Sequence, residues 1–195
     1  CIIQWLQAKR RPVLLAARTG RAAKRLSEAT GREAKTLHRL LEFKPMEGAR
    51  FLRDQDNPLD ADLIIVDESS MIDVLLANHL LKAIEVGSHL LFVGDVDQLP
   101  SVGPGALLKD IIESGVLPVT RLDTIFRQAE DSFIIVNAHR INHGEMPLFS
   151  EQARDFFLFN QPDADQAAEL IIDIVARRIP EKFGYAADRD IQVLS

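Results

Sequence analysis

The 195-residue sequence has one cysteine, no long apolar run and no excess of positive charge. Its single cysteine, Cys1, excludes a disulfide within the chain and suits a reducing compartment, so we expect a cytoplasmic protein. No apolar run reaches membrane-spanning length, and we therefore expect no membrane partner. Lys plus Arg number 23 against 29 Asp plus Glu, a net charge of −6. Contact with nucleic acid would need a local groove, and a protein that never meets DNA fits this charge equally well.

Short apolar runs alternate with helical patterns along the chain. Continuous apolar runs are typical of strands buried on both faces of a parallel sheet. They occur at residues 13–17, 63–66, 89–93, 156–159 and 191–194, with a weaker run at 119–122. Helical patterns occupy residues 20–29, a segment from about Asp73, and a segment that Asp163 would cap and Pro180 would end. This alternation predicts an α/β fold with right-handed crossovers.

The strongest local signal is a pair of acids directly after a strand. Residues 63–66 are all apolar, and Asp67 and Glu68 follow them. In open α/β sheets, ligands bind at the carboxyl ends of the strands. Nucleotide hydrolysis needs one carboxylate there to hold Mg²⁺ and a second to orient or deprotonate the attacking water. The alternative is a helix N-terminus where acids are favoured by the helix dipole, and on this signal alone the two interpretations are even.

A second strand also ends in polar residues. The run at 89–93 is followed by Gly94, which would let the backbone turn sharply, and then by Asp95, Asp97 and Gln98. These side chains would stand at the same sheet edge as Asp67, where an amide such as that of Gln98 can bond a phosphate oxygen or the water beside it. A polar turn rich in Gly and Pro is the alternative, and two such strand ends in one chain make that alternative weaker.

These two segments resemble motifs two and three of superfamily-one DNA helicases of the RecD type, which include the alpha subunit of exodeoxyribonuclease V. The resemblance rests on Asp67-Glu68-Ser69-Ser70-Met71 and on Gly94-Asp95-x-Asp97-Gln98-Leu99-Pro100. Further segments are similar to the family in the same order. They are residues 17–26 (motif Ia, with Arg18 where the family usually has Pro), 36–41 (motif Ib), 122–128 (motif four) and 134–142 (the helix after it).

The resemblance implies two RecA-like (P-loop NTPase) motor lobes, both incomplete. Residues 1–117 would be the first lobe without its phosphate-loop strand, and residues 118–195 the start of the second. No Gly in the sequence is followed by Lys, so the loop Gly-x-x-x-x-Gly-Lys-Ser/Thr is absent from it. Losing a central strand should leave an open seam in the sheet, and we expect such a fragment to self-associate through exposed edges.

The resemblance also implies roles for individual residues, with ATP and Mg²⁺ as cofactors of a longer parent protein. Asp67 would bind Mg²⁺, Glu68 would activate water and Gln98 would read the terminal phosphate. Arg127 would reach across from the second lobe and neutralise charge on the phosphoryl group in transfer. Without the family, Arg127 would be read as a surface residue.

Single-stranded DNA is the implied partner, together with other exodeoxyribonuclease V subunits. Thr19 and Gly20 begin a helix, and a helix N-terminus with a hydroxyl side chain suits a phosphate. His38 lies between apolar residues and could equally be a satisfied core histidine. The full set of expected DNA-side residues is Thr19, Gly20, Arg21, Thr36, His38, Arg39 and Ser101.

We therefore expect the parent to be an ATP-dependent helicase that moves 5′ to 3′ on single-stranded DNA in repair or recombination. The fragment alone should be inactive, because it lacks the phosphate loop. Two alternatives stay open: the helicase part of a conjugative relaxase, and a non-catalytic nucleic-acid-binding module with a degenerate ATP site. The sequence upstream of Cys1 would discriminate among the three.

Overall fold

The computed structural model describes residues 3, 6, 8, 9, 11–46, 48–122 and 132–194. It divides into two compact units, Cys1–Leu122 and Asp123–Ser195. The assignment of two motor lobes with a boundary at residue 117 stays a prediction.

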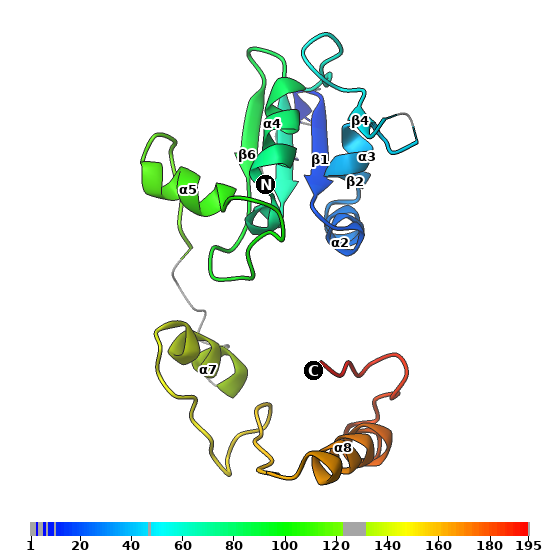
Figure 1. The fold of residues 1–195 in the computed structure, drawn as a ribbon, viewed down its shortest axis with the longest axis vertical. Coiled ribbons are helices and arrows are strands. Elements are labelled where there is room, and N and C mark those ends of the chain that lie inside the picture. Colours follow the sequence, from blue (N-terminus) through cyan, green and yellow to red (C-terminus); the bar gives the residue numbers. More distant parts are fainter. Residues whose placement is uncertain are drawn as a thin grey trace. The chain divides into compact units, whose positions relative to one another are not determined.

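A four-stranded parallel sheet forms the centre of the first unit, in the order β2-β1-β5-β6 (Figure 1). The strands are β1 (Val13–Ala17), β2 (Ala34–Thr36), β5 (Leu63–Asp67) and β6 (His89–Phe92). Three of them confirm the strands expected in the first half of the chain, and β2 was not expected. The predicted α/β class with a parallel sheet is thus confirmed.

Side chains of β5 alternate between the two faces of the sheet. Ile64 and Val66 belong to a buried cluster that includes residues of α3 (Leu37–Leu40) and α4 (Val74–Lys82). Leu63 and Ile65 belong to a second cluster. Leu26 of α2 (Gly20–Thr30), Ile3 and Leu6 pack against that cluster. Because both faces of β5 are covered, none of these four positions carries a polar side chain.

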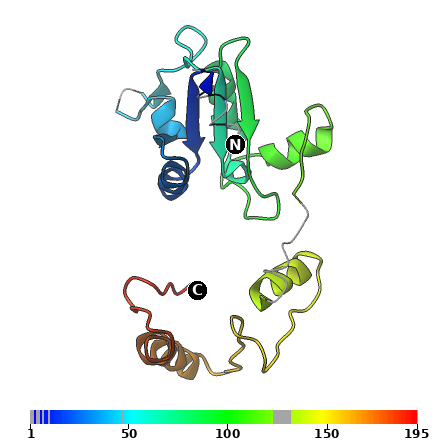
Figure 2. The same cartoon turned by 180° about the vertical axis from the view of Figure 1, so that it is seen from behind.

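Shorter elements complete the first unit. An antiparallel pair, β3 (Phe43–Lys44) and β4 (Arg50–Phe51), follows α3. A 3₁₀ turn, η1 (Ser69–Met71), follows β5, and α5 (Leu107–Ser114) comes after the loop that leaves β6. In both ribbon views α5 lies on the β6 side of the sheet (Figures 1 and 2).

The expected open seam in this sheet is wrong. Strand β5 pairs with β1 over five register positions and with β6 over four, without a gap between them. The backbone groups of these neighbouring strands pair with each other, so the ladder is continuous and its free edges are at β2 and β6. Self-association through those edges stays a prediction.

The described residues of the second unit form helices and irregular segments. The helices among them are α7 (Phe133–Asn142), α8 (Ala164–Asp173), the π-helical turn η2 (Ile174–Arg178) and α9 (Ile179–Phe183). The strands expected at residues 156–159 and 191–194 are wrong, as is the weaker one at 119–122, because the described residues there are irregular. A strand needs a neighbour for its N–H and C=O groups, and none lies beside these runs among the described residues.

Asp163 caps α8 as predicted, because its Oδ1 accepts the Gln166 N–H at 2.9 Å. The prediction that Pro180 ends this helical segment is wrong. The chain runs through the π-helical turn into α9, where Pro180 lies in the first turn, and it ends at Gly184 with φ 74°. A proline is tolerated in a first turn because its missing N–H has no partner there. No described helix is both long and apolar enough to cross a membrane.

Candidate nucleotide and DNA edge

The acid pair lies where β5 ends. Asp67 is the last residue of β5, and its Oδ1 accepts the backbone N–H of Glu68 at 2.9 Å. Glu68 has φ 54° and ψ 43°, in the left-handed region. For a residue with a side chain this conformation costs about 1–2 kcal/mol, and such strained residues cluster at functional sites. Both side chains are half-buried.

The turn after the acid pair is fastened to β6. The Ser69 N–H donates to the Val93 carbonyl at 2.9 Å, and the Ser69 hydroxyl donates to the Val66 carbonyl at 2.8 Å. Gly94 lies against the same turn: a Cβ there would stand 3.0 Å from Ser69 N and 3.1 Å from Ser70 N. Gly94 is not among the glycines with positive φ, so close approach, and not the sharp turn expected, requires it.

Gln98 lies on the loop that leaves β6. Its side-chain Nε2 donates to Asp95 Oδ2 at 3.4 Å, and its backbone N–H donates to the Asp95 carbonyl at 3.3 Å. The side chain is exposed, but it lines a pocket of about 310 Å³ in the first unit. The pocket is formed by Ser70, Val96, Gln98, Pro100, Ala106, Leu108 and Lys109. The structure thus brings the Gln98 loop to the turn that follows Asp67 and Glu68.

Ser70, in the segment Asp67-Glu68-Ser69-Ser70-Met71, also lines the Gln98 pocket, and no role was predicted for it from the sequence. It is 7% exposed, and its hydroxyl oxygen has no hydrogen-bond partner among the described residues. The only available signal was its position two residues after Glu68, which does not by itself distinguish it from Ser69. Burial and the missing partner became visible only in the folded structure.

Arg127 lies outside the described residues, so its predicted reach across the cleft stays a prediction. Mg²⁺ typically takes one or two protein carboxylates and completes its shell with substrate phosphates and water. The described residues contain no cluster of three or more metal-ligand side chains. A single carboxylate at a strand tip, as Asp67 provides, fits a Mg²⁺ ion shared with a nucleotide.

The predicted DNA-side residues follow the neighbouring strands β1 and β2, which pair in parallel with Ala17 opposite Thr36. Thr19 caps α2 by accepting the Ala22 N–H at 3.2 Å, and Thr36 caps α3 by accepting the Arg39 N–H at 3.3 Å. Both hydroxyls therefore already act as acceptors within the fold. Gly20 and the side chains of Arg21 and Arg39 are exposed at these helix starts.

His38 packs in an aromatic cluster. Its ring centroid lies 5.5 Å from that of Phe43 and 5.8 Å from that of Phe51, and Phe51 also contacts His79 at 4.4 Å. Burial, and then the positive charge of Arg18, lower the pKa of His38, while the charge of Asp73 opposes them. The packing alternative for His38 is therefore supported, and its contact with DNA stays a prediction.

Ser101 stabilises the loop after β6. Its hydroxyl lies 3.0 Å from both the Gly103 and the Gly105 carbonyl oxygens. The same loop reaches α4, because the Val74 N–H donates to the Pro104 carbonyl at 3.0 Å. One loop therefore connects the Gln98 pocket with the N-terminus of α4.

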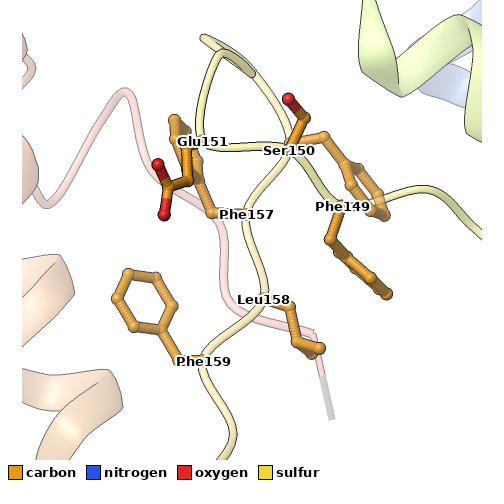
Figure 3. Close-up of a pocket in the computed structure, with 7 residues that line it drawn as sticks. Phe149, Ser150, Glu151, Phe157, Leu158 and Phe159 are labelled. Carbon is orange, nitrogen blue, oxygen red and sulfur yellow. The ribbon is translucent and has the colours of Figure 1, made fainter.

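A second pocket, of about 360 Å³, lies within the second unit and holds none of the predicted site residues. Figure 3 shows Phe149, Phe157 and Phe159 on an irregular segment, together with Glu151. Its lining is mostly apolar and offers one carboxylate. It therefore lacks the paired acids and amide that phosphoryl chemistry needs.

Comparison with known proteins agrees with this geometry. The AAA domain family matches residues 1–104. The ATP-dependent RecD2 DNA helicase of Deinococcus radiodurans is 42% identical over 138 residues, 71% of this chain and 19% of that protein. The RecBCD enzyme subunit RecD of Mycobacterium tuberculosis is 44% identical over 117 residues, 52% of this chain and 20% of that protein.

Among solved structures, a Bacteroides Pif1 bound to single-stranded DNA aligns with a TM-score of 0.46 and 17% identity, covering 88% of this chain and 49% of that one. The chain spans about a fifth of the length of the two curated relatives, 19% and 20%. With more than half of its length matched, this chain belongs to the AAA domain family, and its relatives include an ATP-dependent RecD2 DNA helicase and a RecBCD enzyme subunit RecD.

Proposed function

We propose that this chain forms part of the motor of an ATP-dependent DNA helicase that moves 5′ to 3′ on single-stranded DNA. The observation that carries the proposal is the parallel pairing of β5 with β6. It holds the turn after Asp67 and Glu68 against the start of the Gln98 loop through the bond from Ser69 N–H to the Val93 carbonyl.

In this proposal the residues at the carboxyl ends of the strands have different roles in ATP hydrolysis. Asp67 would hold Mg²⁺, which supplies charge neutralisation at the phosphates when bound. Glu68 accepts a proton from the attacking water, and Gln98 contacts the terminal phosphate or that water. Arg127 comes from beyond the first unit and neutralises charge on the phosphoryl group, so hydrolysis depends on closure of the motor.

Single-stranded DNA would lie along the edge formed by the starts of α2 and α3. Exposed backbone N–H groups at a helix start and the nearby cations Arg21 and Arg39 suit backbone phosphates. Thr19, Gly20, Thr36 and His38 belong to the same proposed edge, and Ser101, on the loop after β6, is a further proposed DNA contact. The net charge of −6 makes this edge a local site and not part of a basic surface. Other subunits of an exodeoxyribonuclease V complex are the proposed protein partners.

The test is Glu68→Gln in the complete helicase polypeptide that contains this sequence. Gln keeps the size and polarity of Glu but cannot accept the proton, so we expect DNA-stimulated ATP hydrolysis to fall by about 100-fold or more. Glu85→Gln, an exposed acid before β6, is the matched control and should hydrolyse ATP like the wild type. Undiminished hydrolysis by Glu68→Gln would rule out the proposed role. The 195-residue chain alone should show no Mg²⁺-dependent turnover, because its sequence lacks the phosphate loop.

A further inference from the structure

The hydroxyl of Ser70 is one of two buried polar groups in the first unit that lack a hydrogen-bond partner among the described residues, the other being Nε of Arg18. The Ser70 hydroxyl is shielded from solvent and makes no hydrogen bond among the described residues. A buried hydroxyl normally finds a partner, because leaving it unpaired costs free energy. Its neighbour Ser69 shows the ordinary solution, donating to the Val66 carbonyl at 2.8 Å. The two adjacent serines therefore differ in what their hydroxyls do.

The turn that carries Ser70 is held by a backbone hydrogen bond and by the close approach of Gly94. Ser69 N–H is bonded to the Val93 carbonyl at 2.9 Å, and a Cβ at Gly94 would stand 3.1 Å from Ser70 N. The turn is thus clamped between β5 and the start of the loop after β6. Ser70 lines the pocket on that side, where Gln98 also contributes to the lining.

Gln98, by contrast, is exposed and lightly held. Its Nε2 donates to Asp95 Oδ2 at 3.4 Å, near the upper limit for a hydrogen bond. The oxygen and nitrogen ends of a carboxamide have almost the same shape, so only the groups around them determine which end faces a ligand. A Gln that must donate to an anionic phosphate needs a neighbour that selects its orientation.

We infer that Ser70 is a positioning residue for Gln98: its hydroxyl donates to Gln98 Oε1 when the loop closes on a nucleotide, which turns Nε2 toward the phosphate. Asp95 favours the same orientation of the Gln98 carboxamide, because its carboxylate accepts a hydrogen bond from Nε2 and repels Oε1. This inference rests on the proposed function, since it needs a phosphate at the strand tips. Ser70 itself touches neither the nucleotide nor the water.

The experiment compares Ser70→Ala, Ser70→Thr and Ser69→Ala in the complete helicase polypeptide. Ser70→Ala should lower kcat for DNA-stimulated ATP hydrolysis by about tenfold, with KM for ATP changed less than about twofold, because orientation and not binding is lost. Its Tm should be unchanged or higher, since no hydrogen bond in the fold is removed. Ser70→Thr keeps the donor and should restore kcat.

Ser69→Ala is the structural control and should lower Tm, because it removes the bond to the Val66 carbonyl. A double-mutant cycle isolates the contact: adding Ser70→Ala to Gln98→Ala should reduce kcat no further. The inference would be overturned if the two substitutions reduced kcat additively, or if Ser70→Ala kept the wild-type kcat. It would also be overturned if Ser70→Ala lost kcat together with a matching loss of Tm. Loss of activity in Glu68→Gln with full activity in Ser70→Ala overturns the Ser70 role alone, whereas a wild type without hydrolysis overturns both proposals.

Discussion

The two units of this chain are stabilised by different kinds of interaction. In the first, a four-stranded sheet is covered on both faces, and Ile64, Val66 and Leu80 are fully buried. In the second, Ala153 is the single buried hydrophobic residue among those described, and the only fully buried large side chain is the polar Asn137. The first unit depends on an apolar core, and the second on local hydrogen bonds and helix caps.

The difference comes from how strands and helices satisfy their backbone. A helix pairs its N–H and C=O groups within itself, whereas a strand needs a second strand. Residues 156–159 are as apolar as residues 63–66 of β5 but have no strand beside them in the described part of the chain, and the rings of Phe157 and Phe159 are about half exposed, at 52% and 54%. They line the pocket of Figure 3 and bury no core. Apolar sequence alone therefore does not produce a strand.

The largest expected contrast is between Ile64→Ala and Phe157→Ala. Ile64 is fully buried in the sheet, so its truncation leaves a cavity that should cost about 2–5 kcal/mol of unfolding free energy. Phe157 is half exposed and has Lys182 Nζ 5.9 Å from its ring centroid, so its truncation should cost less than about 1 kcal/mol. Urea unfolding, monitored by hydrogen exchange of amides in each unit, measures both losses of unfolding free energy. Equal losses would contradict the distinction between the units.

The second contrast tests whether the second unit depends on a polar clamp. Asn137 Nδ2 donates to the Leu148 carbonyl at 2.8 Å, and the Leu148 N–H donates to Asn137 Oδ1 at 2.6 Å. Asn137→Ala leaves both backbone groups of Leu148 without this partner, so we expect a loss of about 1–3 kcal/mol. Exchange of amides in residues 133–150 should accelerate accordingly. Asn142→Ala, at an exposed position of α7, is the control and should leave that exchange unchanged.

The smallest contrast uses two helix caps of the same kind. Thr19 accepts the Ala22 N–H at 3.2 Å, and Asp163 accepts the Gln166 N–H at 2.9 Å. Replacing either cap with Ala should cost about 1 kcal/mol. Because α2 also packs on the sheet, Thr19→Ala should keep its helix, whereas α8 has no buried residue and should fray in Asp163→Ala. Amide exchange in the first turns of α2 and α8 would show this, and equal fraying would argue against tertiary support of α2.

Much of the first unit was predictable from its residues. The uniform apolar runs that became β1, β5 and β6, and the acids and amide after them, are local patterns with a direct physical meaning. The short β2 strand was missed because three residues, Ala34–Thr36, carry too little periodicity to indicate a strand. The continuation of the helix past Pro180 was missed because a proline fits the first turn of a helix as well as it ends one, and here it lies in the first turn of α9.

The sequence by itself determined which residues are apolar enough to be buried and which strand ends carry acids, because hydrophobic periodicity and side-chain chemistry are properties of a local segment. Only the tertiary structure decided which strands pair, that Gly94 must approach the Ser69-Ser70 turn, and that Ser70 is buried without a partner while Ser69 is not. These facts depend on contacts between segments far apart along the chain. Residues 156–159 are apolar but form no strand, because a strand exists only where a neighbouring strand pairs with its backbone.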